Sequence, residues 1–215
     1  MASAAERRAR LEAARLYLVT DDPDVVPAAL DGGVDLVQLR LKDAPDDEIV
    51  AAGRELRDVC DRRGALFIVN DRADLAVACG ADGVHVGQHD EPVESARATV
   101  GPDAIVGLST HTPRQVDAGV RSDADYIAVG PVWETPTKAG RPAAGLGLAR
   151  HAAATVGKPW FAIGGIDAGR VDVVVEAGAR RIVVVRAIQG ADDPRSAAAK
   201  LLRALDREPV GGKAQ

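Results

Sequence analysis

The chain has 215 residues and a formal net charge of −5, and 47% of its residues are hydrophobic while 27% are charged. A chain of this length can bury a substantial core as one large domain or two small ones. The acidic balance argues against a nucleic-acid-binding or membrane-surface protein, because both need a basic face.

The cellular setting is predicted from the cysteines and the N-terminus. Cys60 and Cys79 form no CxxC pair and have no histidine at metal-binding spacing, so we expect buried free thiols in a reducing compartment. The N-terminal residues lack the apolar core of a signal peptide, and no run reaches transmembrane length. The sequence therefore predicts a soluble cytoplasmic protein without membrane or nucleic-acid partners.

Short apolar runs recur along the whole chain, and most are continuous rather than alternating. Strands that are buried on both faces of a parallel sheet have this pattern. The runs are 15–20, 34–40, 65–70, 83–88, 104–110, 125–130, 159–165 and 181–186.

Helical patterns fill most of the gaps between these runs. Residues 45–63 place apolar side chains on one stripe, with proline at the start and glycine just beyond the end. A cap followed by proline opens a helix at Thr112 and again at Asp193. We expect Asp167 to cap a further helix that ends near Gly178.

Alternation of eight strands with helices predicts a single (β/α)8 TIM barrel over residues 1–206, with a frayed tail over 207–215. A doubly wound open sheet shares the βαβα order. It is disfavoured because no GxGxxG follows the first strand and no P-loop is present.

Polar residues gather at the carboxyl end of nearly every predicted strand. They are Gln38, Arg40, Lys42, Asn70, Asp71, Gln88, Asp90, Ser109, His111 and Arg186. In a (β/α)8 barrel these ends form one rim, and active sites are built there. The sequence therefore predicts an active site on this rim.

Two carboxylates in this set, Asp71 and Asp90, follow neighbouring strands. Such a pair suits a hard cation such as Mg²⁺, which prefers oxygen ligands. Ordinary turn chemistry also favours Asp at these positions. The cations on the other strands favour the metal interpretation.

Two further segments have the composition of phosphate sites. The connection 131–147 is long and rich in Pro and Gly, and it offers the hydroxyls of Thr135 and Thr137 with the ammonium of Lys138. Gly164-Gly165 and Val185-Arg186 follow the last two strands, where such barrels commonly bind phosphate. The alternatives are a flexible surface loop and a tight glycine turn.

Cations that face two carboxylates suggest a polyphosphate held by both protein and a bridging metal. A separate phosphate site near the last two strands would hold a different ligand. We therefore expect a two-substrate enzyme that acts on a diphosphate. No catalytic role is predicted for the histidines: His85 lies mid-strand and reads as a core residue, and neither His89 nor His111 has an evident nucleophile partner.

The chain resembles the thiamine-phosphate synthase family from the first strand to the last. The resemblance rests on VQLRLKD (37–43), VNDRAD (69–74), GVHVGQHD (83–90), GLSTHT (107–112), VGPVWETPTK (129–138), AIGGI (162–166) and VVVRAI (183–188). It implies a (β/α)8 enzyme that joins 4-amino-5-hydroxymethyl-2-methylpyrimidine diphosphate to 4-methyl-5-(2-hydroxyethyl)thiazole phosphate and releases pyrophosphate.

The resemblance also implies roles for individual residues. Asp71 and Asp90 would bind Mg²⁺. The pyrimidine diphosphate would contact Gln38, Arg40, Lys42, Asn70, Ser109 and Lys138, of which Arg40, Lys42, Ser109 and Lys138 would serve the reaction. The thiazole phosphate would contact Thr135, Pro136, Thr137, Gly165, Val185 and Arg186.

Two positions depart from the family pattern. Leu41 stands where the family usually has an acidic residue, and Arg186 stands where serine is common. A guanidinium at that place either binds the phosphate more strongly or crowds it. The rival interpretations are a paralogous barrel that isomerises a thiazole carboxylate phosphate and a non-catalytic sensor of phosphorylated ligands.

Overall fold

Eight parallel strands close into a barrel in which each strand pairs with the next in chain order and β8 returns to β1. The structure, a computed structural model, describes residues 2–135 and 142–207. The strands are β1 Leu16–Thr20, β2 Leu36–Leu39, β3 Leu66–Asn70, β4 Gly83–Val86, β5 Ile105–Thr110, β6 Tyr126–Val129, β7 Trp160–Ile163 and β8 Ile182–Val184. The predicted (β/α)8 barrel is therefore confirmed.

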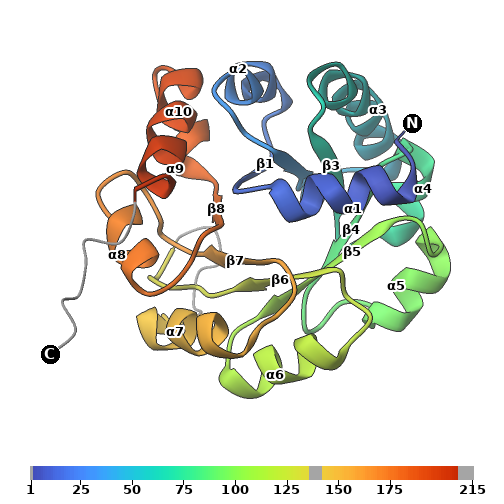
Figure 1. Cartoon of the computed structure of the whole chain (residues 1–215). Helices are drawn as coiled ribbons and strands as arrows, with labels where there is room; N and C mark the ends of the chain where they lie inside the picture. The colour runs from blue at the N-terminus through green and yellow to red at the C-terminus, as the bar shows by residue number, and fades with distance from the viewer. Residues whose placement is uncertain (1, 136–141, 208–215) are drawn as a thin grey trace, which may run out of the picture.

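Helices surround the barrel, as Figure 1 shows. They are α1 Ala4–Ala13, α2 Val26–Asp31, α3 Asp46–Arg63, α4 Ala73–Cys79, α5 Val93–Val100, α6 Pro113–Arg121, α7 Gly145–Thr155, α8 Val171–Glu176, α9 Arg186–Gln189 and α10 Pro194–Leu205. The short 3₁₀ helix η1 covers Pro23–Val25.

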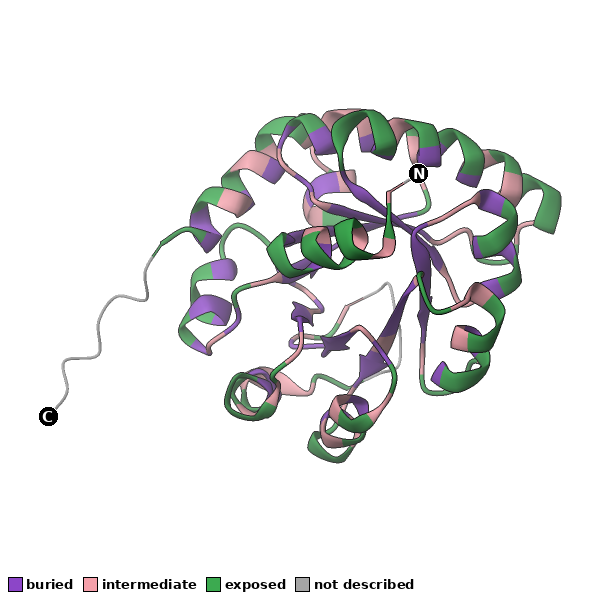
Figure 2. Ribbon diagram, turned by 45° about the vertical axis from the view of Figure 1, so that its right-hand side comes forward, coloured by how far each residue is buried: buried purple, intermediate pink, exposed green. Residues whose placement is uncertain are grey.

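The strands are mainly apolar because both of their faces are buried, as the purple strands of Figure 2 show. Alternate side chains divide between two cores. Leu18, Val37 and Phe67 face the helices, whereas Tyr17 and Ile68 pack inside the barrel. The helices turn exposed residues to solvent on their opposite side.

Helix α1 lies across the amino-terminal end of the barrel, on the near side in Figure 1. It starts with a capping box in which Ser3 and Glu6 bond each other's backbone. Its Leu11 is 2% exposed and belongs to the core inside the barrel. The helix therefore closes this end of the barrel.

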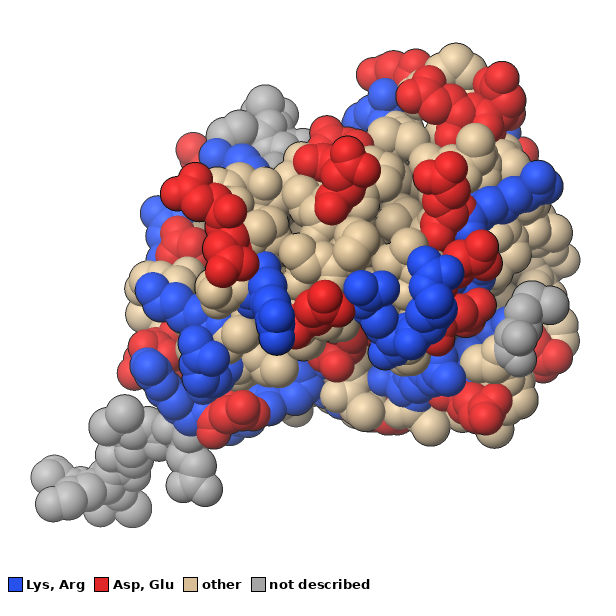
Figure 3. Space-filling view, turned by 90° about the horizontal axis from the view of Figure 1, so that it is seen from above, with Lys and Arg blue, Asp and Glu red and all other residues tan. Residues whose placement is uncertain are grey.

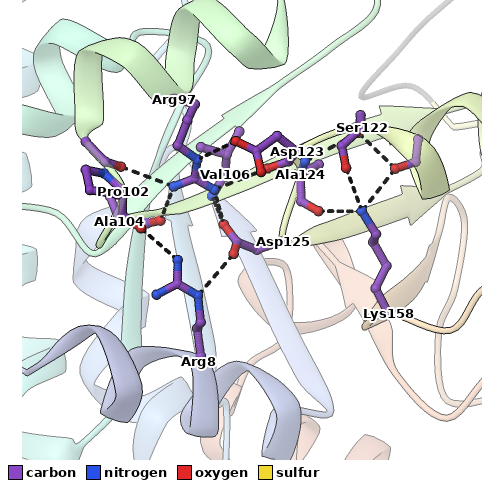
Figure 4. A network of polar contacts seen from close by, with 12 residues as sticks. Arg8, Arg97, Pro102, Ala104, Val106, Ser122, Asp123, Ala124, Asp125 and Lys158 are labelled. Carbon is purple, nitrogen blue, oxygen red and sulfur yellow. Dashed lines mark hydrogen bonds and ion pairs between the residues drawn. The ribbon is translucent and has the colours of Figure 1, made fainter.

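Charged side chains just before two of the strands link neighbouring helices and strands through hydrogen bonds (Figure 4). Asp125 accepts hydrogen bonds from Arg97 and from the Val106 N–H, the latter at 2.8 Å. Lys158 donates to the carbonyl oxygens of Gly119, in the last turn of α6, and of Ser122 and Ala124 just beyond it, the last at 2.7 Å. A cation at a helix carboxyl end is favourable, because the last carbonyls lack partners within the helix.

A second network is buried between helix and strand. Asp82, 2% exposed, accepts from Arg57, from the Phe67 N–H at 2.9 Å and from Arg7 at 2.9 Å. Arg57 also donates to Asp61 at 2.6 Å. Each charge has an opposite charge as its partner within the protein, although Arg57 Nε makes no hydrogen bond among the described residues, so we assign the network to stability.

The predicted helix boundaries are confirmed with one exception. Helix α3 ends at the left-handed Gly64, and both Thr112 and Asp193 cap their helices through their side chains. The expectation for Asp167 is wrong, because α8 begins four residues later at Val171. The Asp167 side chain instead accepts the Gly169 N–H at 2.9 Å and forms a local turn that delays the helix.

Both cysteines are free and buried, as predicted. None of the helices in residues 2–135 and 142–207 combines the length and apolar character that a membrane span needs. On the face drawn in Figure 3, acidic and basic side chains lie interspersed. The predicted tail extends into residues 208–215, which lie outside the described part of the chain.

Candidate active site

A cavity of about 700 Å³ opens at the carboxyl ends of the strands. Its lining includes most of the residues that the sequence placed on the rim. These are Gln38, Arg40, Lys42, Asn70, Asp71, Gln88, Asp90, Ser109, His111, Thr135, Gly165, Val185 and Arg186. Pro136, Thr137 and Lys138 lie outside the described residues, so their predicted places are untested.

The two carboxylates Asp71 and Asp90 interact directly at one side of this cavity. Burial and, after it, the adjacent Asp90 carboxylate raise the pKa of Asp71 to about 6, while Asn70 and Arg40 act in the opposite direction. Asp71 has a φ of 62° and donates its N–H to the His85 carbonyl at 2.8 Å. This left-handed backbone turns the chain sharply as it leaves β3.

The loop after β4 fixes the position of Asp90. Its Oδ2 accepts the Gly87 N–H at 2.7 Å. A Cβ on Gly87 would lie 2.8 Å from the same oxygen, so the close approach requires glycine. The backbone therefore holds this carboxylate through a charge-assisted hydrogen bond.

This donor set fits a magnesium ion. Two carboxylates that repel one another are stabilised by a divalent cation between them. Over the described residues, no group of three or more His, Cys, Asp and Glu side chains could hold a metal. Mg²⁺ commonly uses one or two carboxylates, several waters and substrate phosphates, so a two-carboxylate site is sufficient.

Besides Arg170, three cations line the same cavity: Arg40, Lys42 and Arg186. Arg40 is half-buried, and Lys42 and Arg186 are exposed. Within residues 2–135 and 142–207, none of the three forms an ion pair with a carboxylate. Their charges are therefore available to an anionic ligand.

The floor of the cavity is polar although it lies inside the barrel. Gln38, His85 and Ser109 are between 3% and 7% exposed, and all three line the cavity. His85 is buried as predicted, yet its ring bonds Ser109 and the Tyr126 hydroxyl, each at 2.9 Å. The sequence interpretation missed its place on the floor. The available signal was alternation, since residues 83 and 85 share one face of β4.

The opposite wall is formed by the turn after β7 and the start of α9. Gly164 and Gly165 have φ values of 105° and 67°. A Cβ on Gly164 would lie 2.4 Å from the Pro131 Cβ, so glycine is needed for both conformation and space. Val185 caps α9 and Arg186 begins it.

Arg170 also lines this wall, and sequence reasoning did not single it out. Its guanidinium lies 5.2 Å from the centroid of the Trp133 ring and donates to the Gly165 carbonyl at 2.9 Å. Stacking and a hydrogen bond together restrict the side chain. The sequence gives no signal for this contact, because Arg170 and Trp133 are far apart in the chain and meet only in the folded structure.

A closed (β/α)8 barrel with paired carboxylates, a glycine turn and cations that form no ion pair among the described residues has, on the rim where enzymes of this fold carry their active sites, groups suited to phosphorylated substrates. Residues 16–188 match the family model described as thiamine monophosphate synthase. The chain belongs to this family.

Similar proteins agree with this assignment. The thiamine-phosphate synthase of Mycobacterium bovis is 54% identical over 214 residues, covering 91% of this chain and 96% of the relative. That of Thermobifida fusca is 53% identical over 92% of this chain and 95% of the relative. The solved thiamine phosphate pyrophosphorylase of Pyrococcus furiosus superposes with a TM-score of 0.85 at 34% identity, covering 95% of this chain and 99% of that one. The resemblance noted in the motifs is therefore confirmed.

Proposed function

We propose that the protein is a thiamine-phosphate synthase, a transferase that joins the pyrimidine diphosphate to the thiazole phosphate and releases pyrophosphate. One observation carries the proposal beyond family membership. The paired carboxylates Asp71 and Asp90 share a cavity with the cations Arg40 and Lys42, which form no ion pair within the described part of the chain. This combination suits a diphosphate that is held by protein cations and by a bridging metal.

The reaction places its main demand on the leaving group. The bond that breaks joins a benzylic-type carbon to the diphosphate, and the aminopyrimidine ring stabilises the resulting cation. Arg40 and Lys42 stabilise the negative charge that develops on the departing pyrophosphate. Asp71 and Asp90 would hold Mg²⁺, which supplies Lewis-acid stabilisation of the same charge.

No general base is required, because the attacking thiazole nitrogen already carries a free lone pair. This agrees with a cavity whose one deeply buried histidine, in the described residues, has both ring nitrogens engaged by Tyr126 and Ser109. Ser109 and Gln38 instead form a polar floor for the pyrimidine, and Asn70 lies at its edge.

The thiazole phosphate is assigned to the opposite wall. Gly165, Val185 and Arg186 line the cavity there. The Arg186 guanidinium, where the family commonly has serine, would bind the phosphate rather than crowd it, because its side chain is exposed at the cavity edge. Thr135 lines the same cavity. Pro136 and Thr137 are proposed for this site and Lys138 for the diphosphate on sequence grounds alone.

The direct test incubates pure protein with both substrates and Mg²⁺ and measures thiamine phosphate and pyrophosphate. A synthase forms both products in equal amounts. A barrel that isomerises a thiazole carboxylate phosphate forms neither from these substrates, and a sensor binds them without pyrophosphate release. Absence of both products with a folded protein would overturn the proposal.

The metal assignment is tested with Asp71→Asn and Asp90→Asn. Each should lose most turnover while circular dichroism shows an intact fold. The matched control is Asp74→Asn, because Asp74 is exposed, pairs with Arg72 at 2.7 Å and does not line the cavity. Full activity in both active-site variants would exclude the Mg²⁺ site.

A further inference from the structure

Five hydrogen-bonded side chains cross the barrel interior beneath the cavity, and we call them the polar chain. In order they are Gln38, Tyr17, Tyr126, His85 and Ser109. Gln38 donates through Nε2 to the Tyr17 hydroxyl. The next three links, Tyr17 to Tyr126, Tyr126 to His85 Nδ1 and His85 Nε2 to Ser109 Oγ, each measure 2.9 Å.

The absence of a side chain at Gly107 leaves space for the Tyr126 ring of the polar chain. A Cβ on Gly107 would lie 2.2 Å from the Tyr126 Cζ and 2.4 Å from its hydroxyl oxygen. Tyr17 and Tyr126 are at most 1% exposed and pack edge-to-face with centroids 5.9 Å apart. The two tyrosines belong to a core cluster whose other members, such as Leu36, Ile68 and Phe161, are apolar. Buried hydroxyls at this place therefore need their hydrogen bonds.

Counting the protons available in the polar chain shows which group donates in each of its hydrogen bonds. Burial raises the pKa of both tyrosines, so each keeps its single O–H proton. Because Tyr17 accepts from Gln38, it can use its own proton for Tyr126. Tyr126 then donates to Nδ1 of His85. A neutral imidazole that accepts at Nδ1 carries its proton on Nε2, which donates to Ser109.

With the Gln38 amide donating to Tyr17 through Nε2, the opposite direction leaves a buried proton without a described acceptor. If Tyr126 donated to Tyr17, the Tyr17 oxygen would receive two donors, and its own proton would have no partner among the described residues. An unpaired buried O–H is costly, so the direction from Gln38 to Ser109 is favoured.

We propose that Tyr126 and His85 are positioning residues: the Tyr126 hydroxyl holds His85 as the neutral Nε2–H tautomer, which leaves the Ser109 O–H to donate into the cavity. Because Ser109 Oγ already accepts from His85, its own proton faces an acceptor atom of the bound substrate. The role of that donor in turnover rests on the proposed function, whereas the tautomer does not.

The experiment compares Tyr126→Phe with Tyr17→Phe, two variants that each remove one buried hydroxyl. Tyr126→Phe removes the donor to His85 Nδ1, so ¹⁵N NMR of the His85 ring at pH 8 should show loss of the pure Nε2–H tautomer. Tyr17→Phe leaves the Tyr126 donor in place, so the tautomer should be retained. A purely structural role would give the two variants equal spectra.

Kinetics supply the second readout. Tyr126→Phe should lower kcat about tenfold, the effect of one ordinary hydrogen bond, with a smaller change in KM. Tyr17→Phe should retain most of kcat. In a Ser109→Ala background, Tyr126→Phe should cause no further loss, because both substitutions act through one hydroxyl.

Three outcomes would overturn the proposal: an Nδ1–H or charged His85 in the unmodified protein, equal spectra in the two variants, or additive losses in the double variant. If Tyr126→Phe fails to fold, the spectrum of the unmodified protein still decides the tautomer. A protein without synthase activity but with the Nε2–H tautomer would refute the proposed function and leave the polar chain intact.

Discussion

The glycine that holds Asp90 offers a selective way to disturb the proposed metal site. Gly87→Ala changes neither carboxylate, and its backbone lies outside the left-handed region, so alanine adopts it without strain. The added Cβ would lie 2.8 Å from Asp90 Oδ2, an oxygen that accepts the Gly87 N–H at 2.7 Å. The exposed Asp90 side chain can rotate away, so we expect the fold to tolerate the change.

The size of the effect follows from this geometry. Ordinary contact begins at 3.4 Å, so a carboxylate oxygen that starts 2.8 Å from the new methyl must withdraw by 3.4 − 2.8 = 0.6 Å. The withdrawal lengthens and weakens a charge-assisted hydrogen bond worth about 1.5–3 kcal/mol. Outer partners of metal ligands typically contribute about 10–100-fold to metal affinity. We expect Mg²⁺ binding to weaken by about tenfold, which corresponds to about 1.4 kcal/mol.

The measurement is a Mg²⁺ titration followed both by calorimetry and by the rate of pyrophosphate release. Gly87→Ala should shift both half-saturation points upward equally and recover most of its rate at high Mg²⁺. The control is Gly147→Ala, since a Cβ at that position meets nothing within 4 Å. An unchanged Mg²⁺ requirement in Gly87→Ala would refute the reasoning.

Three further predictions concern stability, the opposite wall and the cysteines. Asp82→Asn leaves Arg57 with only the exposed Asp61, so we expect the free energy of unfolding to fall by about 3 kcal/mol, the low end for a broken buried pair. Thermal unfolding should then shift downward by roughly 6–12 °C, and a loss below about 1 kcal/mol would contradict the buried network. Gly164→Ala combines a φ of 105° with a Cβ only 2.5 Å from the Pro131 Cα, so the KM for the thiazole phosphate should rise; an unchanged KM would remove this turn from the site. Burial raises the pKa of Cys60 to about 12, so at pH 8 a thiol reagent should modify it no faster than the protein unfolds, and faster modification would show that the thiol is accessible.

The sequence alone predicts the barrel because the relevant signals are local. A strand that is buried on both faces, such as Phe67 to Val69, must be apolar throughout, and this pattern appears without any knowledge of its neighbours. Parallel strands bring their carboxyl ends to one rim, so Asp71 and Asp90 were predicted to meet, and the structure places their carboxylates in direct interaction.

Features that depend on contacts between distant segments were not predictable in this way. His85 joins the floor because β4 and β5 pair in a register that brings its ring to Ser109. Arg170 reaches the wall because its guanidinium stacks on Trp133 from the connection after β6. The prediction of a helix cap at Asp167 was wrong for a local reason. An aspartate can cap a helix or form a local turn equally well, and only the backbone conformation decides between the two.

The two ends of the barrel differ in whether their charged side chains have partners within the protein. At the amino-terminal end, Asp82 and Asp125 are each bonded by arginine and by a backbone N–H. At the carboxyl end, Arg40 and Lys42 have no ion pair in the described part of the chain, and the pKa of Asp71 is raised rather than lowered. Buried or clustered charges normally find partners within a protein, because leaving them unpaired costs stability. A rim that leaves anionic and cationic groups unsatisfied side by side is complementary to a ligand that brings both a metal cation and phosphate oxygens.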